Sequence, residues 1–256
     1  MIKNLYRYRE FFKTSVKKEF RGKYKKSILG IFWSFLNPLL QLLVYSVVFS
    51  FLVRDPSISN YTMFLVVGLI PWNFFSNTIS QSNASIVTNG GIIKKIYFPR
   101  EILPISVVTS NLINFLISCV IIVVALFISG IGLSWYALLF PLVLLIQYIL
   151  LIGFSLIISA ITVYIRDLEH FMNILLMLWM YATPILYNPS MIPANLQVLF
   201  KLNPMYHIIV AYRDILYYQT LPNFRDLGII AVICSIIVFV GYAIFKKCEK
   251  RSAEEL

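Results

Sequence analysis

The sequence predicts an all-α integral membrane protein with six transmembrane helices. Hydrophobic residues make up 59% of its 256 residues and charged residues only 13%, whereas soluble domains carry roughly 25% charged residues. Six apolar runs approach or exceed the length of about 20 residues that a membrane helix needs, and none holds a charged residue. They cover residues 28–53, 62–81, 102–130, 135–165, 171–187 and 227–245. One membrane domain is therefore expected at 28–245, preceded by a basic segment at 1–27 and followed by a basic tail at 246–256.

The net charge of +11 is distributed unevenly between the loops that join these runs. Eighteen of the 22 Lys and Arg residues fall before the first run or after the second, fourth and sixth runs. The other side keeps Arg54, Lys201, Arg213 and Arg225. Because basic loops stay on the cytoplasmic side of a membrane, both termini are expected in the cytoplasm. The charge is explained by topology, so no nucleic-acid partner is expected.

Residues 1–27 are predicted to form an amphipathic helix on the cytoplasmic membrane surface. At about 100° per residue, one arc of this helix is apolar and holds Ile2, Leu5, Tyr6, Phe12, Val16, Phe20 and Tyr24. Lysines and arginines lie beside the arc, as is typical of helices that contact lipid phosphates. A disordered basic arm is the alternative. Gly30 then allows a sharp turn into the first span.

Prolines interrupt several of the apolar runs. The first run contains Asn37-Pro38, and the second contains Pro71 within the stretch GLIPWNFF. Proline removes a backbone hydrogen bond and kinks a helix. The fifth run is the shortest and contains Pro184, so a broken or re-entrant helix is the alternative to a span there. Amides within the spans are expected to face other helices or a pore, since an unpaired amide in lipid is costly.

The stretch GGIIKKIYFPRE, residues 90–101, follows the second span on the cytoplasmic side. Its glycine pair allows the chain to break, and one or two helical turns are expected next. One face of these turns is apolar and is formed by Ile92, Ile93, Ile96 and Tyr97. No membrane is left to bury that face, so a protein partner is expected to cover it.

Residues 188–226 form a long segment between the fifth and sixth runs. Prolines divide it into two short amphipathic helices, expected at about 193–202 and 204–218. Both are too short to span a membrane, and we expect them to re-enter the outer leaflet. A structural cap and a gate over an exit are both compatible with this pattern.

The sequence lacks the motifs of several kinds of chemistry. No GxxxxGK[ST] loop occurs, so the chain is not expected to bind ATP, and no Cys or His spacing indicates a metal site. No acidic or basic residue lies within a span to relay protons or sodium. The outer side holds only three scattered carboxylates, Asp55, Asp214 and Asp226. Aromatic residues reach 16%; belts at the membrane interface explain most of them, and weak stacking on sugar rings is a second hypothesis.

These segments together resemble the membrane-spanning subunit of type-2 ABC exporters for polysaccharides, the O-antigen, teichoic-acid and capsule permeases. The resemblance covers the whole chain and is most specific in KKIYFPREILP and LNPM. It is supported by Leu29-Gly30, Asn37-Pro38, GLIPWNFF, YIRDLEH, ATPILY followed by NP, and LNPMYHIIVAYRDIL. It implies six spans, a short cytoplasmic coupling helix at 90–101 and two external gate helices within 188–226.

The resemblance also implies partners and a mechanism. Two copies of the chain would pair with two soluble ATP-binding cassette subunits in the cytoplasmic (inner) membrane of a bacterium. Those subunits would bind ATP and Mg²⁺, whereas this chain would bind no cofactor and hold no catalytic residue. ATP-driven motion would move a lipid-linked polysaccharide, such as an O-antigen or a teichoic acid, through a channel between the two copies within the lipid bilayer.

Four groups of residues take roles in this expected mechanism. Coupling to the ATPase is expected of Ile92, Ile93, Lys94, Lys95, Ile96, Tyr97, Arg100 and Glu101. A gate at the start of the first span would involve Leu29, Gly30, Trp33, Asn37 and Pro38. The external gate would involve Pro189, Asn203, Pro204, Tyr206, Tyr212 and Arg213. The glycan channel would be lined by Trp72, Asn73, Phe75, Asn77, Trp179 and Tyr181.

The sequence alone is also compatible with three other classes of function. An ABC exporter of a small molecule or drug would share the fold and differ in cargo. A proton-coupled flippase is disfavoured by the lack of charge within the spans, and a membrane-embedded glycan-processing enzyme by the sparse outer carboxylates. Co-purification with an ATPase distinguishes the ABC exporters from the other two classes.

Overall fold

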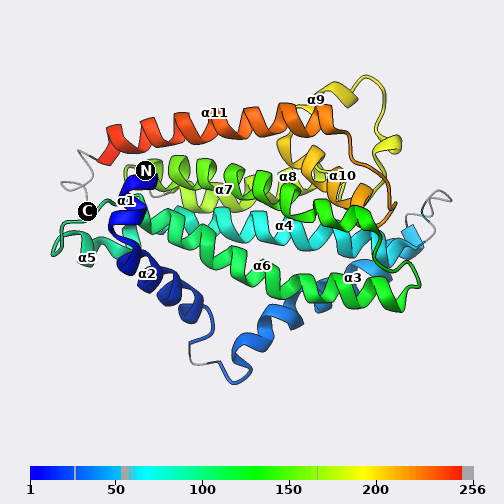
Figure 1. Cartoon of the computed structure of the whole chain (residues 1–256), viewed down its shortest axis with the longest axis horizontal. Coiled ribbons are helices and arrows are strands. Elements are labelled where there is room, and N and C mark those ends of the chain that lie inside the picture. Colours follow the sequence, from blue (N-terminus) through cyan, green and yellow to red (C-terminus); the bar gives the residue numbers. More distant parts are fainter. Residues whose placement is uncertain (26, 53–57, 59, 166, 250–256) are drawn as a thin grey trace.

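In this computed structural model, helices form every regular element of the described part of the chain, residues 1–25, 27–52, 58, 60–165 and 167–249 (Figure 1). The α-helices are α1 (Ile2–Arg7), α2 (Arg9–Gly22), α3 (Trp33–Leu52), α4 (Tyr61–Asn83), α5 (Gly90–Ile93), α6 (Ile102–Ile128), α7 (Phe140–Thr162), α8 (Leu168–Tyr181), α9 (Gln197–Lys201), α10 (Pro204–Leu216) and α11 (Phe224–Glu249). Short 3-10 helices are η1 (Gly30–Phe32), η2 (Val87–Asn89), η3 (Trp135–Leu139) and η4 (Pro189–Met191). The predicted all-α class is confirmed.

Five helical segments in the described residues are long and apolar enough to cross a membrane. They are Gly30–Val48, Tyr61–Asn83, Ile102–Ile128, Trp135–Thr162 and Phe224–Glu249. These segments correspond to the first four apolar runs and the sixth. The last four run along the long axis of the molecule and the first crosses it obliquely (Figure 1), so five of the predicted spans are supported.

The fifth apolar run forms a shorter helix than expected, and a total of six spans is not confirmed. α8 ends at Tyr181 after 14 residues, although the apolar run continues beyond it. Pro184 lacks a backbone N–H and disfavours helix at Thr183. The carbonyl groups of Pro184 and Ile185 accept hydrogen bonds from the side chain of Arg213 instead.

The two ends of the bundle differ in charge. The N-terminus, α1, α5 and the last turns of α11 gather at one end, and α9 and α10 lie toward the other (Figure 1). We call these the basic end and the α10 end, because the first holds the cations of α1, residues 94–100 and the last turn of α11. Which side of the membrane each end faces stays a prediction. Arg166 and residues 250–256 of the expected tail lie outside the described residues.

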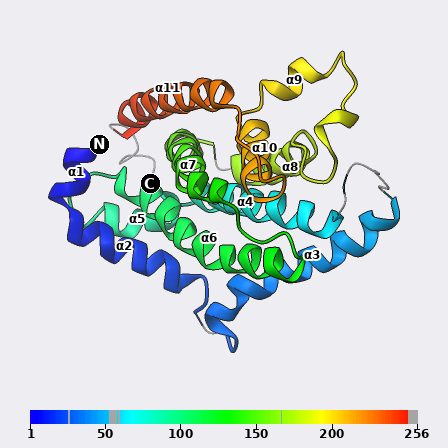
Figure 2. The ribbon, with the colours of Figure 1, turned by 45° about the vertical axis from the view of Figure 1, so that its right-hand side comes forward.

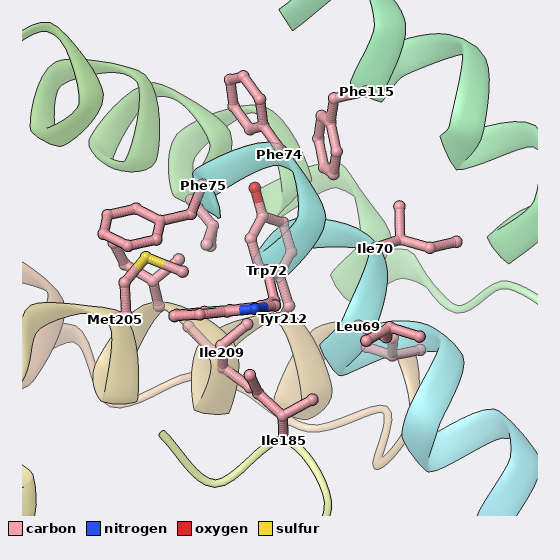
Figure 3. Close-up of a cluster of buried hydrophobic side chains, with 14 of the residues drawn as sticks. Leu69, Ile70, Trp72, Phe74, Phe75, Phe115, Ile185, Met205, Ile209 and Tyr212 are labelled. Carbon is pink, nitrogen blue, oxygen red and sulfur yellow. The ribbon is translucent and has the colours of Figure 1, made fainter. Parts of the chain in front are cut away.

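The core is centred on α4, which contacts α3, α6, α7, α8 and α10. Its aromatic side chains pack among rings from the neighbouring helices (Figure 3). Phe74 stacks on Phe115 of α6 with ring centroids 4.9 Å apart, and Trp72 lies 5.3 Å from Phe75. Such ring pairs add stability beyond the apolar area they bury.

α11 is held against α7 at a close crossing. A Cβ atom placed on Gly241 would lie 2.7 Å from the carbonyl oxygen of Gly153, so glycine at this position lets the two backbones touch. This crossing fixes the course of α11 toward the basic end, where Lys246 and Glu249 end the helix.

The N-terminal segment folds as α1 and α2, and α2 packs along α6 (Figure 2). Val16 of α2 is buried, and Phe11 contacts Phe98 with ring centroids 4.5 Å apart. Lys18 Nζ donates a hydrogen bond to Asn89 Oδ1 at 2.6 Å. Part of the predicted amphipathic face therefore meets protein, where lipid was expected. The position of α2 at the membrane surface stays a prediction.

Candidate functional site

The segment predicted to couple to an ATPase forms an exposed tip at the basic end. α5 covers Gly90–Ile93 and a turn follows, so one of the expected one or two helical turns forms, and Ile96 and Tyr97 lie beyond it. Tyr97 is 95% exposed and Ile96 is 57% exposed, and the adjacent Lys94 and Lys95 are exposed as well. The structure thus places two large apolar side chains and two cations on one surface. We call these four residues the tip.

The remaining residues of the predicted coupling group face the protein. Ile92 is half-buried and Ile93 packs against the small apolar cluster that contains Phe245. The backbone N–H of Arg100 donates to Glu249 Oε1 at 3.1 Å. Glu101 is fully buried.

Glu101 joins three segments that are distant in the sequence. Its carboxylate accepts hydrogen bonds from Asn4 Nδ2 of α1 at 2.8 Å and from Lys246 Nζ of α11 at 2.7 Å. Lys246 also pairs with Glu249 at 2.6 Å. Burial raises the pKa of Glu101, but the hydrogen bonds from Lys246 and Asn4 outweigh it and leave the pKa below its usual value. We call Asn4, Arg100, Glu101, Lys246 and Glu249 the Glu101 cluster.

A polar cavity of about 420 Å³ lies between α3, α4 and α6. Its wall carries six side-chain amides, those of Asn37, Gln41, Asn73, Asn77, Asn111 and Asn114. Hydroxyl groups and rings in the wall come from Tyr24, Trp33, Ser34, Phe74, Phe115 and Ser118, and Pro38, Leu40 and Ile70 also line it. We call this space the amide cavity. It brings Trp33, Asn37 and Pro38 of the predicted gate together with Asn73 and Asn77 of the predicted channel lining.

Several of the cavity's polar groups bond to one another. Asn73 Nδ2 donates to Gln41 Oε1 at 2.6 Å, which joins α4 to α3. Asn114 Oδ1 accepts from Ser34 Oγ at 2.6 Å and from the Tyr24 hydroxyl. These bonds hold the start of α3 beside α6.

A lysine lies next to one wall of the amide cavity. Lys23 Nζ donates to Asn111 Oδ1 at 2.7 Å, and Asn111 Nδ2 donates to Gln81 Oε1 at 3.1 Å. Burial lowers the pKa of Lys23 to about 8, although Glu19 opposes the shift. The charge of Lys23 is therefore near an amide that lines the cavity.

The other predicted lining and gate residues lie elsewhere. Trp72, Phe75 and Trp179 belong to the aromatic core, where the Trp179 ring lies 5.0 Å from that of Phe75. Tyr181 is 54% exposed at the end of α8. Leu29 is 46% exposed and precedes Gly30, whose φ of +52° is a conformation that glycine adopts readily.

Asn203 fixes the start of α10. As the N-cap residue, its side chain accepts from the backbone N–H of Met205 at 3.0 Å. It also accepts from Trp179 Nε1 at 2.9 Å and donates to Thr183 Oγ1 at 2.8 Å. Pro204 follows at the first helical position. Among the other predicted gate residues, Tyr206 is half-buried and Pro189 begins η4.

Two residues of the predicted external gate are core residues in the structure. Tyr212 is fully buried and its hydroxyl donates to Gln147 Oε1 of α7 at 3.0 Å. Arg213 is 1% exposed and donates to the carbonyls of Pro184, Ile185 and Phe64. α10 is thereby anchored to α4, α7 and the segment after α8.

The sequence analysis missed the partners of Glu101, and of the six cavity amides it assigned only Asn37, Asn73 and Asn77 to a gate or a channel. Asn4, Glu101 and Lys246 carry no shared motif, so no signal in a single sequence links them. Asn73, Asn77 and Gln81 do have a signal, because their spacing of four places them on one face of α4. Among the described residues, no group of three or more His, Cys, Asp or Glu side chains could hold a metal ion.

Comparison with known proteins gives consistent matches over most of the chain. Residues 10–217 match the model of a family described as the ABC-2 type transporter. The chain is 34% identical to the O-antigen export system permease protein RfbA of Myxococcus xanthus over 100% of this chain and 99% of that protein. It is 39% identical to the RfbA protein of Klebsiella pneumoniae over 93% and 92% of the two chains. It is 24% identical to the polysialic acid transport protein KpsM of Escherichia coli over 91% of each chain.

Proposed function

Because this chain belongs to the ABC-2 type transporter family, as the sequence predicted, we propose that it is the permease of an exporter for an O-antigen-like polysaccharide. The relatives named for O-antigen export match it over nearly their full lengths. KpsM, named for polysialic acid transport, is a more distant relative and also carries a glycan. We propose that the cargo is a lipid-linked polysaccharide and that two copies of the chain form the conduit in the bacterial cytoplasmic membrane.

The tip is the observation that carries the proposed coupling to an ATPase. An exposed tyrosine and isoleucine on a loop are costly in water unless a partner covers them. Lys94 and Lys95 beside them favour a partner surface with acidic groups. We propose that an ATP-binding cassette subunit receives the tip in a groove, binds ATP and Mg²⁺ itself, and leaves this chain without a catalytic role.

Gating at the α10 end would involve α9 and its flanking loops. Tyr212 and Arg213 hold α10 in the core, so α10 is the fixed element against which a gate would move. Val198 and Leu199 of α9 are 71% and 63% exposed, which leaves α9 free of extensive packing. The second candidate, an exporter of a small molecule or drug, has no specific support from the amide-rich cavity, because drug sites are predominantly apolar.

Ile96→Ser combined with Tyr97→Ser should abolish co-purification of the ATPase subunit while the permease remains in the membrane. Both side chains are exposed and make little contact within the chain, so the substitutions remove apolar area only from the tip. Pull-down of the tagged permease from detergent extracts, followed by immunoblotting for the ATPase, measures the effect. We expect at least a tenfold loss of bound ATPase, since losing a buried anchor side chain costs about 2 kcal/mol or more.

Val198→Ser with Leu199→Ser is the matched control, because it also removes two exposed apolar side chains, here from the α10 end. Undiminished ATPase binding by the tip variant would contradict the proposed docking. Cargo is tested separately by deleting the permease and staining the cell surface for polysaccharide. Unchanged surface polysaccharide with increased sensitivity to drugs would support the second candidate.

A further inference from the structure

The amide cavity has a polar wall that carries no charged side chain: no Lys, Arg, Asp or Glu is among the described residues that line it. The cavity of similar size at the basic end, in contrast, is lined by Arg7, Arg100, Lys246 and Glu249. A wall of neutral amides and hydroxyls offers both donors and acceptors without a net charge. Such a wall suits a neutral ligand with many hydroxyl groups.

Two of the amides make no side-chain hydrogen bond with any described residue. Asn37 of α3 and Asn77 of α4 are both exposed in the cavity wall. At membrane depth an amide facing lipid would cost several kcal/mol, on the order of 2–7. The amide row continues along α4 from Asn73 through Asn77 to Gln81, toward the basic end. Repeated costly groups on one face indicate a polar occupant along that face.

A tryptophan at the same wall is held in a defined orientation. Trp33 Nε1 donates to Ser27 Oγ at 3.0 Å, and the side chain is half-buried. Ring faces pack against apolar C–H surfaces, while neighbouring amides bond to hydroxyl groups. The volume of about 420 Å³ falls within the range of small-molecule pockets, about 300–1,000 Å³.

We propose that the amide cavity binds sugar units of the transported polysaccharide inside each single protomer. This inference rests on the proposed function and adds a site whose described lining residues all belong to one copy. The unpaired amides of Asn37 and Asn77 hydrogen-bond to the sugar hydroxyls, and Trp33 supplies an apolar surface. Gln41 and Asn73 are bonded to each other. Lys23 lies behind Asn111 and keeps that amide oriented.

Photo-crosslinking at the cavity tests this site directly. The photoreactive residue p-benzoylphenylalanine replaces Asn77 in one strain and Ser235 in another, in cells fed a radiolabelled hexosamine. Ser235 is the control because it is an exposed polar residue of α11 whose hydroxyl bonds only within its own helix. After irradiation, the purified permease is analysed for sugar label. We expect at least a tenfold excess of label on the Asn77 variant over the Ser235 variant.

Absence of that excess in cells that still export polysaccharide would overturn the inference and leave the proposed function intact. If a deletion strain keeps its surface polysaccharide, the proposed function fails and the inference fails with it. A second pair of variants covers the possibility that the bulky probe blocks the cavity. Asn37→Leu with Asn77→Leu should lower export at least fivefold, whereas Ser235→Leu should not; equal export by the two would count against the site.

Discussion

Arg213→Met is expected to destabilise the protein strongly and to abolish export with it. The guanidinium group is fully buried, donates to three backbone carbonyls and lies 3.4 Å from the centroid of the Phe64 ring. Methionine fills similar space but donates no hydrogen bond. The carbonyls of Pro184 and Ile185 would then lose this donor in a buried setting, at about 1–3 kcal/mol each. A loss of roughly 2–6 kcal/mol is expected for the two carbonyls together.

Thermal unfolding of the detergent-solubilised protein, followed by tryptophan fluorescence, measures this loss. Arg225→Met is the matched control, since Arg225 is exposed near the start of α11 and the charge change is the same. Gly68→Ala probes the site from the other side, because its Cβ would lie 2.7 Å from Arg213 Nη2. It should give a smaller shift in the same direction. Equal melting temperatures for Arg213→Met and Arg225→Met would show that the buried guanidinium is not an anchor.

The case of Arg213 shows what a single sequence could and could not predict. The apolar runs predicted five of the spanning helices because a span requires only a sufficient length of uncharged chain. Arg213 was placed in an external gate because it lies in the predicted short helix at 204–218, one of the two that the resemblance implies to be gate helices. Its burial depends on the carbonyls left free where α8 ends before Pro184, and that pairing spans 29 residues. A pattern among neighbouring residues in the sequence does not indicate partners that are this far apart.

The tip and the amide cavity, like the spans, could be predicted only in part from the sequence. The exposed Ile96 and Tyr97 could be predicted because no membrane run remains to bury them. The end of α5 at Ile93 and the contact of Phe98 with Phe11 of α2 could not be predicted, since Phe11 and Phe98 are distant in the sequence. The amides of α4 have a visible spacing, but their meeting with Asn111 and Asn114 depends on how α4 and α6 cross. The sequence therefore predicts which groups are costly in the membrane, and the fold decides where they meet.

Glu101→Gln is expected to uncouple ATP hydrolysis from export without releasing the ATPase. Glu101 is buried, follows the tip closely in the sequence, and bonds to α1 through Asn4 and to α11 through Lys246. Motion imposed on the tip therefore reaches two other helices through one carboxylate. Glutamine keeps the shape and can still accept from Asn4, but it loses the charge that Lys246 faces. We expect export per ATP hydrolysed to fall about tenfold, because a hydrogen bond between charged groups contributes about 1.5–3 kcal/mol.

Reconstituted vesicles that contain both subunits provide the measurement, with ATP hydrolysis and glycan transport followed in parallel. Glu10→Gln is the control, since Glu10 makes only exposed ion pairs with Arg9 and Lys13, and such pairs contribute about 0–1 kcal/mol. A merely structural role for Glu101 would lower hydrolysis and transport equally. A double-mutant cycle that combines Glu101→Gln with Lys246→Met measures the interaction between Glu101 and Lys246. A coupling energy below about 0.5 kcal/mol would show that these two residues act independently.

The pH dependence of this cluster follows from the direction of the pKa shift. The hydrogen bonds from Lys246 and Asn4 bring the pKa of Glu101 below its usual value of 4.5, despite the opposing effect of burial. A lowered carboxylate pKa contributes stability that is present above the unfolded value and is lost as the pH falls through the folded value. Glu101 therefore stays ionised between pH 6 and pH 8, and its titration should not change the amount of export per ATP hydrolysed in that range. The Glu101→Gln variant mimics the protonated state at neutral pH, so its defect should likewise be constant across that range.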